Sequence, residues 1–167
     1  MTTTHGLPGL RQVDHLGFTV PDIKQAIEFF ITVIGCKELY RIGPFASEDD
    51  WMKVHLNVHP RTTIPEIAVL SCPNGLTLEI FQYVSADEDA VTTQPRNSDL
   101  GGHHIAFYVE DMDKAIAHLS KHNVQLLGEP TTMTEGPSAG ETWCYFLTPW
   151  GMQLELVSSP DGKAYNK

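Results

Sequence analysis

Hydrophobic and polar residues alternate near the start of the chain. Leu16, Phe18 and Val20 fall on one face of an extended segment, which predicts a half-buried strand. Asp22 follows in the position of a helix N-cap, and apolar residues then recur at helical spacing until Gly35. The pattern therefore predicts a strand followed directly by an amphipathic helix.

The same pattern returns in the second half of the chain. Residues 103–116, HHIAFYVEDMDKAI, match residues 14–27, DHLGFTVPDIKQAI, at a constant shift of 89 positions. A later pair, PNGLTLEI at 73–80 and PWGMQLEL at 149–156, matches at a shift of 76. The chain is thus predicted to hold two copies of one module in the same order. Because the second shift is smaller, the first copy has the longer middle segment.

Extended, turn-separated segments follow each predicted helix. The last two of each copy are predicted to form a hairpin over Pro-Asn-Gly or Pro-Trp-Gly. The predicted fold is α+β, with two βαβββ modules at residues 11–83 and 102–158. Residues 84–101 are polar, acidic and rich in turn residues, as expected of a linker. Residues 1–167 are expected to form a single domain from these two modules.

Four polar side chains lie on the faces of the predicted strands opposite the apolar positions. They are His15, Glu79, His104 and Glu155. Two modules related by a pseudo-twofold axis would bring them together in one concave space. Two imidazoles and two carboxylates suit one divalent transition metal ion of the group Mn, Fe, Co, Ni or Zn. His103 remains an alternative to His104 as the ligand.

Other residues on these strands are candidates for contacts with a substrate. Gly17 and Ala106 each follow a predicted ligand by two positions, which leaves space beside the imidazole. Several tyrosines could donate a hydrogen bond to a substrate oxygen: Tyr40, Tyr83, Tyr108 and Tyr145. Tyr108 shares a strand face with His104 and is the predicted substrate-binding residue.

Charge, hydropathy and cysteine content limit the partners and the cellular location that the sequence predicts. The chain has 21 acidic and 11 basic residues and a formal net charge of −10, so nucleic acid and anionic membranes are poor partners. No apolar run reaches the length of a membrane span, and no secretory signal is expected. The three cysteines form no CxxC pair, which favours a reducing, cytoplasmic location.

Taken together, these segments resemble the vicinal oxygen chelate superfamily, which includes glyoxalase I, methylmalonyl-CoA epimerase, extradiol dioxygenases and antibiotic-resistance proteins. Four segments carry the resemblance: VDHLGFTVPDIKQAIEFF, NGLTLEIF, GGHHIAFYVEDMDKAIAHL and YFLTPWGMQLELV. The resemblance implies a cupped, incompletely closed eight-stranded sheet with helices outside and a metal inside. Its ligand positions fall on the same two histidines and two glutamates, and a homodimer is the usual assembly. The last of the four segments is most similar to cyclitol epimerases of the valiolone type.

The favoured function is a metal-dependent epimerase or isomerase of a small hydroxy-carbonyl or acyl compound. A metal that chelates the carbonyl and a neighbouring oxygen would stabilise the enolate formed when an α-proton leaves. Glu79 and Glu155 are the predicted catalytic bases. Carboxylates on opposite sides of the metal suit removal of a proton from one face and its return to the other.

Three alternatives remain open. A lactoylglutathione lyase of the glyoxalase I type needs basic residues for the glutathione carboxylates, and the sequence brings no two arginines together. An extradiol dioxygenase uses two histidines and one carboxylate on Fe(II), so the second glutamate argues against it. A metal-free binding or resistance protein has no use for four ligand positions.

Overall fold

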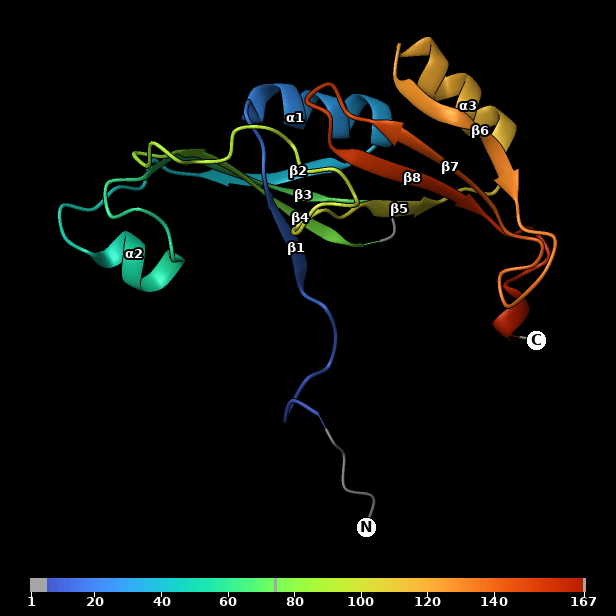
Figure 1. Cartoon of the computed structure of the whole chain (residues 1–167), viewed down its shortest axis with the longest axis horizontal. Helices are drawn as coiled ribbons and strands as arrows, with labels where there is room; N and C mark the ends of the chain where they lie inside the picture. Colours follow the sequence, from blue (N-terminus) through green and yellow to red (C-terminus); the bar gives the residue numbers. More distant parts are fainter. Residues whose placement is uncertain (1–5, 74, 167) are drawn as a thin grey trace. The chain divides into compact units, whose positions relative to one another are not determined.

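The computed structural model describes residues 6–73 and 75–166 (Figure 1). The chain divides into two compact units, residues 1–88 and 89–167. Each unit contains one four-stranded mixed sheet with few helices, which confirms the α+β prediction of two βαβββ modules. The joining of both sheets into one cup stays a prediction of the family resemblance.

In unit 1, the first and last strands lie side by side although they are far apart in the sequence. Its strands are β1 (His15–Thr19), β2 (Lys37–Ile42), β3 (Thr63–Ser71) and β4 (Thr77–Val84), in the spatial order β1-β4-β3-β2. β1 pairs with β4 in parallel, and the other neighbours are antiparallel. The first strand is therefore hydrogen-bonded to the last. The predicted β3–β4 hairpin is present, although Asn74 of its turn lies outside the described residues.

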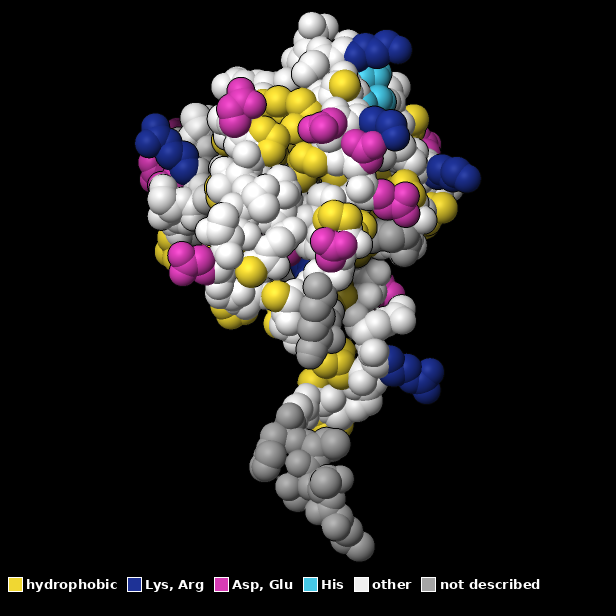
Figure 2. Space-filling view, turned by 90° about the vertical axis from the view of Figure 1, so that its right-hand side faces the viewer, with side chains coloured by type: hydrophobic (Ala, Val, Ile, Leu, Met, Phe, Trp, Pro, Cys, Tyr) yellow, Lys and Arg dark blue, Asp and Glu magenta, His cyan; other side chains and the backbone are white. Residues whose placement is uncertain are grey.

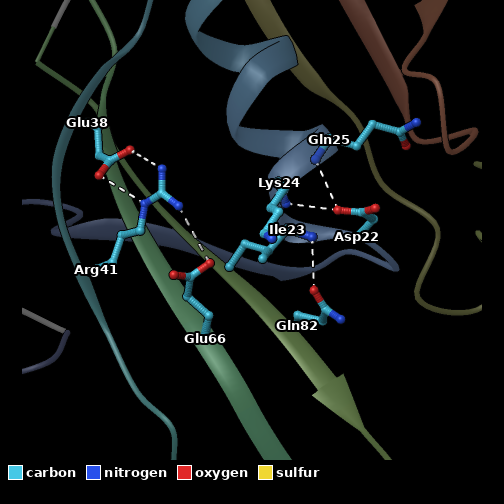
Figure 3. Close-up of polar contacts among 8 residues, drawn as sticks. All are labelled: Asp22, Ile23, Lys24, Gln25, Glu38, Arg41, Glu66 and Gln82. Carbon is cyan, nitrogen blue, oxygen red and sulfur yellow. Dashed lines mark hydrogen bonds and ion pairs between the residues drawn. The ribbon is translucent and has the colours of Figure 1, made fainter.

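Helix α1 (Ile23–Phe29) covers one face of the unit 1 sheet and continues into the π-helical turn η1 (Phe30–Ile34). As predicted, Asp22 is the N-cap: its carboxylate accepts hydrogen bonds from the backbone of Lys24 and Gln25 (Figure 3). Gln82 of β4 accepts a third from the backbone N–H of Ile23, at 3.0 Å. These bonds hold the start of the helix against β4, and η1 ends at Gly35, which has a φ of 87°.

A second helix, α2 (Trp51–Leu56), lies on the other side of this sheet from α1 (Figure 1). Its one buried residue is Met52, which packs with Ile64 and Ile67 and against Phe81 and Tyr83. α2 belongs to the middle segment that makes the first module longer than the second. The two faces of β4 therefore differ: fully buried Leu78 and Ile80 face the core, and aromatic residues face α2.

Unit 2 repeats the same arrangement. Its elements are β5 (Ile105–Tyr108), α3 (Met112–Lys121), β6 (Gln125–Thr132), β7 (Thr142–Leu147), β8 (Gln153–Ser158) and the 3-10 turn η2 (Ala164–Asn166). The strand order is β5-β8-β7-β6, with β5 and β8 parallel. Asp111 is the N-cap of α3, as Asp22 is of α1, and accepts a hydrogen bond from the backbone N–H of Lys114. Phe146 and Leu154 are fully buried at the centre of the sheet.

Charged side chains are distributed over the outer surfaces of the units. In unit 1, Arg41 of edge strand β2 forms a bidentate ion pair with Glu38 and approaches Glu66 (Figure 3). On the face drawn in Figure 2, lysine and arginine side chains stand apart from one another among acidic ones. None of the helices in the described part of the chain has the length and apolar character that a membrane span requires.

Candidate active site

The first predicted histidine and glutamate meet on neighbouring strands. His15 begins β1 and Glu79 lies in β4, and their Nε2 and Oε2 atoms are 3.2 Å apart. The parallel register pairs Glu79 with Gly17. A Cβ at this position would make ordinary van der Waals contact with the Phe81 ring at 3.6 Å and with the Glu79 carboxylate at 3.9 Å, so only a small side chain is accommodated beside the pair. We call His15 and Glu79 the first pair.

Unit 2 contains the equivalent second pair, His104 and Glu155. His104 immediately precedes β5, Glu155 lies in β8, and their Nε2 and Oε2 atoms are 3.0 Å apart. Ala106 occupies the register position opposite Glu155, as Gly17 does in the first unit. The repeated sequence thus produces a repeated local geometry.

Each histidine is also held by its other ring nitrogen. Asp14 lies 2.9 Å from Nδ1 of His15, and the Asn97 side-chain amide lies 3.2 Å from Nδ1 of His104. The hydrogen bond to Asp14, reinforced by the Glu79 charge, raises the pKa of His15. Both imidazoles therefore direct Nε2 toward a carboxylate while a second side chain fixes the ring. At His15, Nδ1–H donates to Asp14, as in metal-binding histidines, whereas at His104 the Asn97 amide nitrogen donates to Nδ1.

The two carboxylates differ in their environment. The Glu155 side chain is 13% exposed and that of Glu79 is 26% exposed. Burial raises the pKa of Glu155, and the nearby Glu141 adds to this effect. His104 and Lys163 act in the opposite direction, but desolvation outweighs them. The second pair is thus the more enclosed of the two.

Among the residues that the structure describes, no group of three or more histidine, cysteine, aspartate or glutamate side chains is placed to hold a metal ion. Each unit instead brings together two of the four predicted ligands. His103 is in neither pair, and its Nδ1–H donates to the carbonyl of Gly101 at 3.0 Å. The four-ligand set stays a prediction that requires both pairs to meet.

Tyr108, the predicted substrate-binding residue, is 56% exposed, and its hydroxyl donates to the Ser159 carbonyl at 3.2 Å. Tyr145 lies closer to the second pair. It is directly opposite Glu155 in the β7–β8 ladder, and its ring makes an edge contact with His104 at a centroid distance of 5.1 Å. The hairpin register counted outward from the Pro149–Gly151 turn would have identified this neighbour.

Comparison with known proteins identifies the family of the chain. The family model described as Glyoxalase/Bleomycin resistance protein/Dioxygenase superfamily matches residues 14–146. The chain belongs to this superfamily. It is 44% identical to a 2-epi-5-epi-valiolone epimerase from Actinomyces sp over 99% of this chain and 88% of that protein. The prediction of an isomerase-class enzyme within the superfamily is confirmed by this relative.

More distant members share the fold. A glyoxalase family protein from Bacillus cereus is 24% identical, with a TM-score of 0.69 over 94% of this chain and 98% of the other. A fosfomycin resistance protein from Listeria monocytogenes is 14% identical, with a TM-score of 0.57 over 89% and 93%. Members of the superfamily commonly use a divalent metal ion.

Proposed function

We propose that the protein is a metal-dependent epimerase of a cyclic polyhydroxy ketone. The observation that carries this proposal is the duplicated pairing of His15 with Glu79 and of His104 with Glu155. The related 2-epi-5-epi-valiolone epimerase supports both the reaction type and the substrate class.

The donor set fits a divalent transition metal. Both pairs present an imidazole Nε2 beside a carboxylate oxygen, and nitrogen with oxygen donors suits ions from Mn to Zn. The three cysteines are buried and lie outside both pairs, so thiolate ligands play no part. A bound ion would supply Lewis-acid stabilisation of the negative charge that develops on the substrate's carbonyl oxygen.

The glutamates provide the proton chemistry. A carboxylate oxygen takes the proton from the carbon beside the ketone as that C–H bond breaks, and the electron pair moves into the carbonyl. Return of a proton to the opposite face of the same carbon inverts its configuration. Glu79 and Glu155 come from equivalent positions of two modules, which suits one carboxylate for each face of the substrate.

A glyoxalase I-type lyase is less well supported. Its thiol substrate, glutathione, carries two carboxylates that call for free basic side chains. Arg41 is already paired with Glu38, and Arg61 donates to the backbone carbonyls of Ser47 and Asp49. These contacts leave both arginines engaged away from the histidine–glutamate pairs.

Metal content and epimerisation test the proposal together. Protein purified without chelator or metal-affinity resin should contain close to one divalent ion per chain by elemental analysis. With 2-epi-5-epi-valiolone in deuterium oxide, it should form the epimer and incorporate deuterium beside the ketone. Chelator-treated protein is the matched control and should regain activity with Mn, Co, Ni or Zn.

Two outcomes would contradict the proposal. One is a protein that takes up none of these ions, and the other is oxygen consumption with a catechol. Turnover of a glutathione hemithioacetal would instead favour the lyase. The homodimer and the cytoplasmic location stay predictions; sedimentation equilibrium tests the first.

A further inference from the structure

The two histidine–glutamate pairs have equivalent geometry but different neighbours. The residue opposite Glu79 on β3 is Val69, which is buried and apolar. The residue opposite Glu155 on β7 is Tyr145, whose hydroxyl makes no hydrogen bond among the described residues. The duplicated sheet thus presents an apolar position in one unit and a free hydroxyl group in the other.

Charged side chains extend this difference in unit 2. Glu141 immediately precedes β7 and forms an ion pair with Lys163 at 3.5 Å. Glu141 lies two residues before Trp143 and four before Tyr145, so strand alternation places its side chain on the same face of the sheet as their rings. Trp143 shares the strand face of Tyr145, with ring centroids 5.2 Å apart. This end of the unit 2 sheet therefore combines an aromatic surface with polar groups.

The matching end of the unit 1 sheet also has a tyrosine, Tyr83, on which the Glu79 charge acts. There Phe81 stacks on Tyr83, and both rings pack against the buried cluster that contains Met52 of α2. Met52 is 1% exposed, so its side chain is fully enclosed between α2 and the sheet. The segment that distinguishes the first module from the second supplies this apolar cover.

We propose that Tyr145, Glu141 and Lys163 form a hydroxyl-binding subsite that holds the ring hydroxyls of the polyhydroxy ketone next to Glu155. This inference rests on the proposed function for its substrate class. The Tyr145 hydroxyl and the Lys163 ammonium donate hydrogen bonds, and the Glu141 carboxylate accepts them. Trp143 packs against the C–H groups of the ring, because polyol rings present apolar edges between their hydroxyls.

The subsite also selects one orientation of the substrate. A ring bound through its hydroxyls to unit 2 presents the same face to Glu155 in every turnover.

Three variants test the subsite: Tyr145→Phe, Glu141→Gln and Lys163→Met. Tyr145→Phe and Lys163→Met each remove a hydrogen-bond donor, Glu141→Gln replaces one acceptor oxygen by a donor amide and removes the charge, and all three keep most of the side-chain volume. With 2-epi-5-epi-valiolone, each should raise KM about tenfold, since one hydrogen bond to the ligand is lost. We expect a smaller change in kcat and unchanged metal content. Tyr40→Phe and Lys114→Met are matched controls, because Tyr40 lies on an exposed edge strand and Lys114 on α3.

Calorimetric titration of the same ketone separates this inference from the proposed function. Weaker binding in the three variants, together with no turnover by wild type, would support the subsite and overturn the epimerase. Turnover by wild type with unchanged KM and affinity in all three variants would overturn the subsite alone. A wild-type protein that neither binds nor converts the ketone would overturn both.

Discussion

The orientation of each imidazole in the two histidine–glutamate pairs depends on the side chain that contacts its Nδ1 atom. Asp14 precedes His15 in sequence, whereas Asn97 reaches His104 from the turn before β5. That turn is closed by backbone bonds from Asp99 to Arg96 and from Gly102 to Asp99. A Cβ at Gly102 would collide with the Arg96 carbonyl, so only glycine allows this approach.

If these contacts orient metal ligands, their loss should weaken metal binding. We expect Asp14→Ala and Asn97→Ala each to reduce the affinity for Co(II) about 10- to 100-fold. Equilibrium dialysis measures this directly, without reference to turnover. His103→Ala serves as the control and should bind the ion like wild type. Equal affinity in all four proteins would show that neither contact orients a ligand.

At this scale the sequence pattern predicts strand faces and misses individual contacts. Strand alternation in the two copies predicts that His15, Glu79, His104 and Glu155 face away from the core, whereas their pairing two by two follows from the parallel ladders that the fold shows. Asn97 lies in a polar segment with no periodicity, where only the folded turn reveals its partner. To predict that Tyr145 lies beside Glu155, one needs the register of the β7–β8 hairpin as well as the strand face of each residue.

Among the helices, two follow from the sequence pattern and a third depends on its packing in the fold. α1 and α3 have an aspartate N-cap and apolar residues at helical spacing, and both are confirmed. α2 has only six residues and buries one side chain. A helix this short has too few internal hydrogen bonds to be stable alone, so its position depends on packing of Met52 against the sheet.

This dependence predicts a large effect from a single substitution. Met52→Ala should lower the free energy of unfolding by about 2–5 kcal/mol, because it removes a fully buried side chain and leaves a cavity. Urea denaturation followed by circular dichroism measures the change. Val54→Ala in the same helix is the control and should be nearly neutral, since Val54 is 71% exposed. Similar losses in both variants would mean that helix propensity, rather than packing, holds α2.

On the scale of the whole molecule, two copies of one module each supply a carboxylate. Their sequence equivalence predicts equivalent chemistry, and their unequal exposure modifies it. In the proposed mechanism, each of the two carboxylates serves one face of the same substrate carbon. The repeat is visible in the sequence, whereas the difference in exposure arises from the folded surroundings of each glutamate.

Glu79→Gln and Glu155→Gln should therefore impair inversion by about 10²–10⁴-fold while retaining most of the metal. Each variant keeps one base, so each should still exchange deuterium into one epimer and not into the other. Mass spectrometry of both epimers after incubation in deuterium oxide gives the result. Full inversion by both variants would show that the glutamates are ligands only and that the base is elsewhere, with Tyr108 the first candidate.

The parallel pairing of β1 with β4 has a consequence for how the protein is made. β2, β3 and β4 are consecutive neighbours in the sheet, but β1 leaves the ribosome first and gains its partner last. Until then β1 has an unpaired strand edge, to which another chain could pair. The strand has only five residues, with a glycine at the centre, so this edge is short. His15 meets Glu79 only when the last strand of unit 1 has been translated. The first pair therefore forms only after all four strands of its unit are present, whereas β2, β3 and β4 each pair with a neighbour in sequence.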